Sequence, residues 1–182
     1  MATNVEFGNY EPTEQEDFRV INVNIDVYFD GTLNNMYNSD EKKDNTDAFK
    51  KYGTAKKKDT SYYNDWSNVA RLWEVSDQKT KIYVEGIGTE EKKKDSTMGF
   101  AYGSGNTGVV GKVEMGCEKI AQKVSSEKDK AGAEKVAVLT LDVFGFSRGS
   151  AAARNFVHEV GRQKHKSRMV PVAVGRTVAM QR

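Results

Sequence analysis

The feature that most constrains this chain is the stretch Gly145-Phe146-Ser147-Arg148-Gly149, together with its flanking segments. Residues 136–144, before it, are nearly all apolar and predict a buried strand, and residues 150–158, after it, predict a helix that begins with small side chains. A strand, a Gly-x-Ser-x-Gly turn and a helix in this order form the setting of a nucleophile elbow. We therefore predict Ser147 as a nucleophile, with Gly145 and Gly149 as the glycines that let the turn pack closely. A chance match in a glycine-rich turn is the alternative.

Two further segments predict strands of the same sheet. Apolar and polar side chains alternate over residues 21–29, which is the pattern of a strand with two unlike faces. Residues 81–84 form a short apolar run, and a helical pattern over residues 110–124 separates this run from the strand at 136–144. A strand, a helix and a strand in sequence predict parallel pairing. The fold class is therefore α/β, with a parallel sheet, flanking helices, and the strand at 136–144 in the centre, covered on both faces.

The loop after the first strand, Asp30-Gly31-Thr32, has three interpretations. The nucleophile loop of haloacid-dehalogenase-type phosphatases needs an aspartate two positions before Asp30, where this chain has Tyr28. A loop at a strand end can also supply a backbone N–H group to an oxyanion hole, together with the residue after the serine, here Arg148. The third interpretation is a turn in which Asp30 caps its own backbone and Gly31 provides conformational freedom.

The remaining segments predict supporting structure. Residues 1–19 are expected to form a polar arm, and residues 36–63 a polar loop. Within residues 64–75, Trp66, Val69, Leu72 and Trp73 recur at helical spacing and predict a helix packed on the core. Cys117 lies on the apolar face of the next predicted helix and is interpreted as a small buried hydrophobe, while Asp142, inside the apolar strand, predicts a buried acid with satisfied hydrogen bonds. The glycines of residues 99–105 predict a mobile flap, and residues 170–174 one more strand.

Composition excludes several classes of function. The 28 basic and 26 acidic residues give a net charge of +2, which is not the footprint of a nucleic-acid-binding protein. The single cysteine excludes an intrachain disulfide. The N-terminal segment lacks the pattern of a secretory signal, and no run approaches the roughly 18 apolar residues of a membrane span.

Four separated stretches together resemble one protein family. In order they are Phe29-Asp30-Gly31-Thr32-Leu33-Asn34-Asn35, Ser67-Asn68-Val69-Ala70-Arg71-Leu72, Tyr83-Val84-Glu85-Gly86-Ile87-Gly88-Thr89, and Gly145-Phe146-Ser147-Arg148-Gly149-Ser150-Ala151-Ala152-Ala153-Arg154. Their order and spacing over residues 20–160 are similar to the bacterial α/β-hydrolase domain of unknown function that includes type VI secretion lipase effectors of the first class. The resemblance implies that residues 20–182 form an N-terminal portion of a larger α/β-hydrolase domain.

The resemblance also implies an activity. Members of the family use a Ser-Asp-His triad, and characterised ones are phospholipases that attack the membranes of rival cells. By resemblance Ser147 is the nucleophile, and Asp30, Gly31, Thr32 and Arg148 lie on the oxyanion side. The implied substrate is a membrane phospholipid, with no cofactor or metal, and the implied partners are a spike protein of the secretion apparatus and an immunity protein. The family also implies synthesis in the bacterial cytoplasm without a signal peptide and secretion into a target cell by a type VI system.

The rest of the triad departs from the family pattern. In α/β-hydrolases the acid and then the histidine follow the serine. Here 35 residues follow Ser147, with no aspartate, one glutamate (Glu159) and two histidines (His158 and His165). His158 falls on the helix after the elbow and His165 in a basic linker, so we expect the base and its acid to come from sequence absent here. Two alternatives stay open: a catalytically silent binding module of a secretion apparatus or membrane surface, and a serine hydrolase that acts on a different ester.

Overall fold

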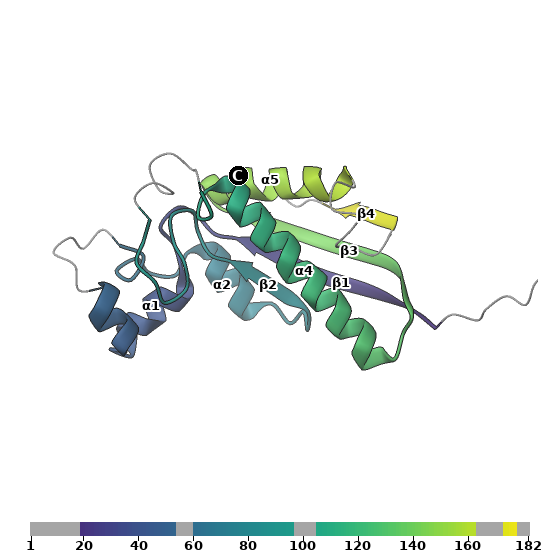
Figure 1. The fold of residues 1–182 in the computed structure, drawn as a ribbon, viewed down its shortest axis with the longest axis horizontal. Helices are drawn as coiled ribbons and strands as arrows, with labels where there is room; N and C mark the ends of the chain where they lie inside the picture. Colours follow the sequence, from purple (N-terminus) through teal and green to yellow (C-terminus); the bar gives the residue numbers. More distant parts are fainter. Residues whose placement is uncertain (1–18, 54–59, 97–104, 163–172, 178–182) are drawn as a thin grey trace, which may run out of the picture.

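The chain forms a parallel sheet with helices on both sides (Figure 1). The computed structural model describes residues 19–53, 60–96, 105–162 and 173–177, and every structural statement concerns these residues. The strands run in the order β2-β1-β3-β4, and all neighbouring pairs are parallel. Their bounds are β1 Val20–Phe29, β2 Lys81–Val84, β3 Lys135–Gly145 and β4 Ala173–Thr177.

This arrangement confirms the α/β class and the parallel direction of the strands predicted from the sequence. The predicted pairing of the strands at 81–84 and 136–144 with each other is wrong, because β1 lies between them. β1 lies between β2 and β3, and β3 lies inside the sheet between β1 and β4, as expected for its apolar sequence. The strand predicted at residues 170–174 corresponds to β4, which starts at Ala173. The polar arm predicted at the N-terminus and most of the predicted flap lie outside the described ranges.

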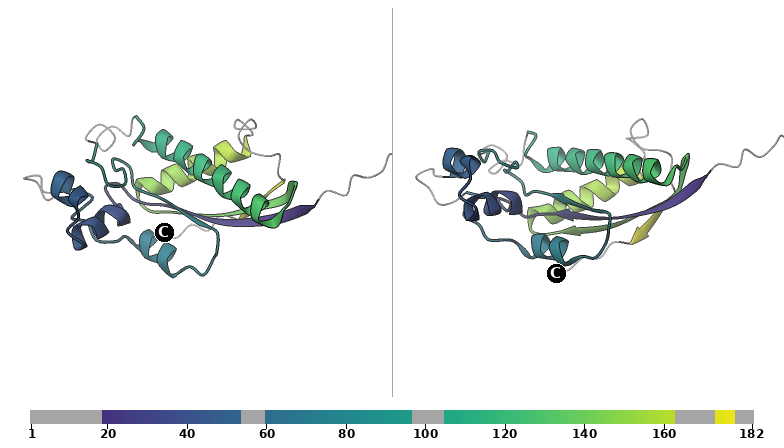
Figure 2. Two further views of the ribbon diagram at one scale, coloured as in Figure 1. Left: turned by 60° about the horizontal axis from the view of Figure 1, so that its bottom comes forward. Right: turned by 90° about the horizontal axis from the view of Figure 1, so that it is seen from below.

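Two helices, α4 (Val109–Ala131) and α5 (Arg148–Gly161), cover the first face of the sheet (Figure 2). Alternate residues of β1 point to this face, because successive side chains of a strand point to opposite sides. They pack against one stripe of α4 and against small residues and Phe156 of α5. Cys117 is buried in this core, and burial raises the pKa of its thiol to about 11, in agreement with its predicted role as a packing residue. The buried residues of this hydrophobic core are Val23, Ile25, Val27, Phe29, Ile82, Val84, Val113, Cys117, Ile120, Val124, Val136, Leu139, Leu141, Val143, Ala152, Ala153 and Phe156.

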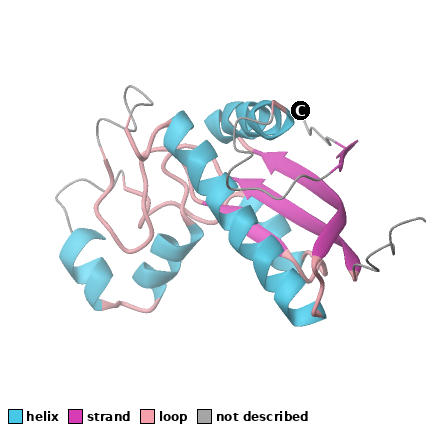
Figure 3. Cartoon of the chain, turned by 45° about the vertical axis from the view of Figure 1, so that its right-hand side comes forward, coloured by secondary structure: helices cyan, strands magenta, loops and turns pink. Residues whose placement is uncertain are grey.

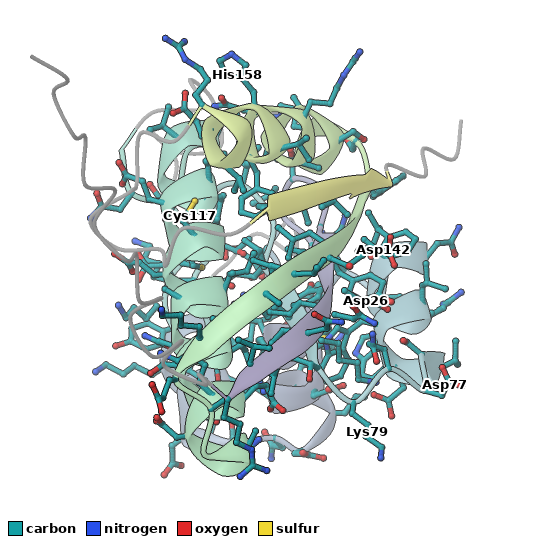
Figure 4. All side chains as sticks on the ribbon, turned by 90° about the vertical axis from the view of Figure 1, so that its right-hand side faces the viewer. Asp26, Asp77, Lys79, Cys117, Asp142 and His158 are labelled. Carbon is teal, nitrogen blue, oxygen red and sulfur yellow. The ribbon has the colours of Figure 1, made fainter. Side chains whose placement is uncertain are left out.

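The second face of the sheet is covered only in part, by α2 (Asn68–Val75). Tyr28 and Tyr83 are buried beneath α2, but on β3 the side chain of Val138 is 37% exposed. Asp142 is half-buried beside Asp26 on this same face (Figure 4). The predictions that helices cover both faces of β3 and that Asp142 is buried are therefore wrong, because α2 packs on β1 and β2, towards one side of the sheet.

The helix predicted at residues 64–75 is shorter than expected. It begins after Ser67, whose side chain caps it by accepting a hydrogen bond from the Ala70 amide (3.1 Å). Leu72, which was predicted to be core, is 39% exposed, because the inward face of this short helix carries Val69, Ala70 and Trp73 instead.

A third part of the molecule, which we call the polar lobe, comprises residues 31–53, 60–67 and 85–96. The loop predicted over residues 36–63 is wrong in part, because α1 spans Met36–Lys43 and a π-helical turn spans Phe49–Gly53. α1 has no apolar stripe that the sequence could reveal, and its start is fixed by the Asn35 side chain, which accepts a hydrogen bond from the Asn38 amide. Polar side chains that are fully buried hold the lobe together; they include Asn35, Asn38, Ser39, Ser61 and Thr89.

Candidate active site

The site expected from the sequence lies where the chain leaves β1 and β3 in opposite directions. The connection after β1 leads to α2 on the second face, whereas the connection after β3 is α5 on the first face. Two adjacent strands of this kind mark the topological switch point of an open α/β sheet, where ligands bind outside the carboxyl ends of the strands. Figure 3 shows the strand arrows pointing toward the loops that gather at this end, next to α1. Ser147 and the Asp30–Thr32 loop are at this position.

Ser147 has the backbone geometry of a strained turn. It is exposed and joins β3 to α5 with φ 53° and ψ −131°, a conformation that residues with a side chain rarely adopt. Such a residue costs about 1–3 kcal/mol and persists only when its surroundings enforce it. The turn is tight on both sides, as the motif predicts. A Cβ on Gly145 would lie 2.7 Å from the Ser150 Cα, and one on Gly149 would lie 2.2 Å from the Asp30 carbonyl oxygen.

The loop after β1 lies directly against this turn. The Phe146 amide donates a hydrogen bond to the Phe29 carbonyl oxygen (3.1 Å). This bond continues the hydrogen bonding between β1 and β3 by one residue beyond the end of β3. The Arg148 Nε donates to the Thr32 hydroxyl at 2.7 Å. The ring of Phe146 covers Gly31 so closely that a Cβ there would lie 2.6 Å from a ring carbon. The structure thus brings Asp30, Gly31 and Thr32 beside the predicted nucleophile.

The amides of this loop are largely committed to other acceptors. The Gly31 N–H donates to the carboxylate of Asp30 (2.6 Å), the Leu33 N–H to the Ile87 carbonyl (3.1 Å) and the Asn34 N–H to the Gly31 carbonyl (2.9 Å). In the described ranges no acceptor faces the Thr32 N–H. An anion at this edge would therefore find its loop donor at Thr32, because the Gly31 amide is already bound.

Asp30 itself is a buried acid, with 2% of its surface exposed. Its second carboxylate oxygen accepts a hydrogen bond from the Tyr83 hydroxyl at 2.5 Å. Burial raises the pKa of this carboxyl, although the hydrogen bonds that it accepts oppose the shift. In a haloacid-dehalogenase-type loop Asp30 would be the second aspartate, which must also reach the substrate, whereas both oxygens of Asp30 are bonded inside the protein.

A second buried charge cluster lies at the end of β2, and sequence reasoning missed it. Lys112, in the first turn of α4, is 1% exposed; its Nζ lies 3.2 Å from Glu85 and donates to the Thr89 carbonyl (2.8 Å). Lys119 approaches the same carboxylate at 3.5 Å. Burial alone would raise the pKa of Glu85, but the two lysines together lower it. Glu85 and Tyr83 belong to the stretch Tyr83–Thr89, one of the four that carry the family resemblance. Lys112 lies among the apolar positions of its helix, and no sequence pattern indicates that it is buried.

The structure does not bring a histidine to Ser147 within the described residues. His158 is exposed on α5, with its Nδ1 3.6 Å from the Glu159 carboxylate, and it points away from the sheet (Figure 4). Ten residues of helix separate it from Arg148, a rise of about 15 Å. Asp142 precedes Ser147 by five residues of chain, about 16 Å along a strand. His165 lies outside the described ranges.

The site offers no evident place for a metal ion. Across residues 19–53, 60–96, 105–162 and 173–177, no group of three or more histidine, cysteine or acidic side chains could hold one. None of the helices described here is both long and apolar enough to cross a membrane. Comparison of the chain with known protein families, with curated proteins and with solved structures found no match.

Proposed function

We propose that this chain carries the nucleophile part of a serine ester hydrolase of the α/β-hydrolase kind. The observation that carries the proposal is the backbone of Ser147, held at φ 53° between β3 and α5 at the switch point of the sheet. A serine on such a turn presents its hydroxyl above the sheet, which is what a nucleophile elbow requires. Strain of this kind is typical of functional positions.

In the proposed reaction the Ser147 hydroxyl attacks the acyl carbon of an ester and releases the alcohol, leaving an acyl-enzyme that water then hydrolyses. The carbonyl oxygen becomes an oxyanion in the tetrahedral intermediate. Two backbone N–H groups would stabilise it: that of Thr32, on the loop after β1, and that of Arg148, at the start of α5, where the helix dipole also favours an anion. A base must take the hydroxyl proton, and we assign this role to a histidine oriented by an acid, a pair that the described residues do not place at Ser147.

The substrate and setting follow from the sequence resemblance. We propose a glycerophospholipid substrate and the antibacterial role of a type VI secretion effector, with a spike protein and an immunity protein as partners and a target cell as destination. In support, residues of three of the four sequence blocks meet at one edge. The Asp30 loop contacts the elbow through Gly149, and contacts the block after β2 through Tyr83 and Gly86.

A catalytically silent binding module is the alternative function. One observation favours it for this chain alone: His158, the histidine within the described residues, is exposed and points away from the sheet (Figure 4). A serine without a base is a poor nucleophile. We therefore expect the 182-residue chain by itself to hydrolyse phospholipid vesicles hardly at all. Efficient hydrolysis by this chain alone would mean that His158 or His165 is the base.

A fluorophosphonate probe tests the proposal directly, because it labels only activated serines. We expect a longer protein that contains this chain and supplies the base to be labelled at Ser147, and its Ser147→Ala variant to stay unlabelled. Peptide mapping would identify the labelled residue. If this folded protein is not labelled, the binding-module alternative holds. If it is labelled but leaves phospholipid vesicles intact, the ester is of a different class.

A further inference from the structure

We propose that the Tyr83 hydroxyl and the Asp30 carboxylate are positioning groups, which hold the loop after β1 so that the Thr32 N–H faces the nucleophile. This inference rests on the proposed hydrolase function, since it assigns how the oxyanion donor is held. Neither side chain is proposed to touch the substrate.

One hydroxyl holds both ends of the loop. The Tyr83 oxygen donates to Asp30, the first residue after β1, and accepts a hydrogen bond from the amide of Met36 (3.1 Å), the first residue of α1. Tyr83 is buried and lies on β2, beside Tyr28 of β1. The loop between Asp30 and Met36 is therefore closed by a side chain from the neighbouring strand, which the sheet itself keeps in place.

The other oxygen of Asp30 decides which amide of the loop points outward. It binds the Gly31 N–H at 2.6 Å, so this amide faces the interior. The Gly31 carbonyl accepts from Asn34, which turns the chain back, and the Asn34 carbonyl accepts from Gly86 (2.8 Å). With these contacts satisfied, the N–H groups of Thr32 and Asn35 are the loop amides without an acceptor among the described residues. Asn35 is 1% exposed, so the Thr32 N–H is the one that a ligand could reach.

The elbow rests on the same residue. Gly149 packs against the Asp30 carbonyl so closely that a Cβ would come within 2.2 Å of its oxygen. On the other side of the turn, Arg148 donates to the Thr32 hydroxyl. A displacement of Asp30 would therefore move the oxyanion loop relative to Ser147, and a shift of about 1 Å at a reacting centre can reduce turnover about 100-fold.

Burial suits the pair to this task. It raises the pKa of the Tyr83 phenol well above its ordinary value, so the hydroxyl keeps its proton and acts as a donor to Asp30 at neutral pH. A buried acid and phenol cost desolvation energy, and an apolar pair of the same size would fill the space at lower cost. The polar pair fixes the orientation of the loop after β1, because hydrogen bonds require particular angles, whereas apolar contacts do not.

The test compares two buried tyrosines in the same protein that contains this chain and supplies the base. Tyr83→Phe removes the hydroxyl that holds the loop. Tyr62→Phe is the matched control, because Tyr62 is equally buried but its hydroxyl donates to the Lys93 carbonyl (3.1 Å), away from the loop. We expect Tyr83→Phe to lower kcat about 10- to 100-fold with KM nearly unchanged, and Tyr62→Phe to keep both. Equal kcat in the two variants, measured on folded protein, would overturn the inference.

Asp30 gives a second comparison within the pair. Asp30→Asn retains one oxygen that can accept the Gly31 N–H, whereas Asp30→Ala retains none. We expect the asparagine variant to recover part of the turnover that the alanine variant loses. Identical losses would contradict a role in which the accepted hydrogen bond orients the loop.

Hydrogen exchange of the loop amides separates this inference from the proposed function. In Tyr83→Phe the Gly31 amide should exchange about 10- to 100-fold faster than in the wild type, as loss of one buried hydrogen bond implies, while Tyr62→Phe should leave it protected. If the wild type shows no esterase activity, the proposed function fails and the exchange result alone decides whether Tyr83 holds the loop. If the wild type is active and Gly31 exchange is unchanged in Tyr83→Phe, the positioning role fails and the hydrolase proposal stands.

Discussion

The first face of the sheet is held by apolar side chains of α4 and α5, whereas the polar lobe is held by hydrogen bonds from buried Asn, Ser and Thr side chains. Apolar packing depends on volume and has no preferred direction, so it can rearrange around a change. A buried hydrogen bond requires a partner at a fixed distance and angle. The proposed site lies where these two regions meet: the packed core supports Ser147, and the bonded lobe supports the loop that faces it.

The largest effect is expected in the apolar region. Phe156→Ala removes a fully buried ring that packs on Phe29, with ring centres 5.3 Å apart. We expect the free energy of unfolding to fall by about 3–5 kcal/mol, measured by urea denaturation. Val110→Ala is the control, because Val110 is 62% exposed on α4 and should change stability by less than about 0.5 kcal/mol. A similar loss in both variants would mean that the core is not where the structure places it.

A nearly equal effect is expected where the two regions join. Lys112→Met leaves Glu85 buried with Lys119 as its remaining cation, and breaking a buried pair from one side costs about 3–5 kcal/mol. Adding Glu85→Gln should recover part of this loss, because the uncompensated charge disappears. A single variant as stable as the wild type would show that the ion pair contributes nothing.

The ion pair of Glu85 and Lys112 should also make the stability of the protein depend on pH in the acid range. The pKa of Glu85 is lowered in the folded protein, so its contribution to stability is complete above the ordinary value of 4.5 and is lost as pH falls toward the lower folded value. Between pH 5 and pH 3 the wild type should therefore lose more stability than Glu85→Gln, by about 1.4 kcal/mol for each tenfold difference in proton affinity between the unfolded and folded carboxyl. Urea denaturation across this pH range measures the loss, and parallel stability curves for the two proteins would contradict a lowered pKa.

A change in the polar lobe at the site should affect turnover more than stability. Gly31→Val would drive a side chain into the ring of Phe146 and displace the loop. In a protein that contains this chain and supplies the proposed base, we expect turnover to fall about 100-fold, which is typical for the loss of one oxyanion donor. Thr32→Ser keeps the backbone N–H and the hydroxyl that Arg148 contacts, so it should do far less. Near-full activity of folded Gly31→Val would mean that this loop is only a turn.

The smallest of these effects is expected away from the site. The buried Asn38 amide donates to Ser61 (2.9 Å) and to the Glu90 carbonyl (3.0 Å), and its oxygen accepts from the Lys92 amide (2.7 Å). Asn38→Ala leaves these groups without their partner and should cost about 1–3 kcal/mol, measured by thermal unfolding. We expect turnover of the folded variant to persist. A loss of turnover without a loss of stability would show that the whole lobe, and not only its edge, positions the site.

The sequence predicted the parts of this molecule that follow a period or a motif. The alternation in β1, the apolar run of β3 and the glycines around Ser147 are patterns formed by residues that are close together in the sequence. The contact between Asp30 and Tyr83 joins residues 53 positions apart and has no local pattern. The burial of Lys112 could not be predicted from the sequence either, because a lysine on a helix usually has an exposed side chain. α1 was missed since its stability comes from bonds to distant loops rather than from an apolar stripe.

The parallel sheet gives the molecule two ends with different tolerance to engineering. Because the strands are parallel, their carboxyl ends lie at the edge of the sheet where Ser147 is found. The turns at the opposite edge are therefore far from Ser147. The turn at Gly132, a left-handed residue between the end of α4 and the start of β3, belongs to this far edge. So does the exposed segment before β2 that contains Asp77 and Lys79 (Figure 4). Exposed turns of this kind accept insertions readily. A fluorophore, an affinity tag or a short tether placed there would report on the protein without entering the chemistry.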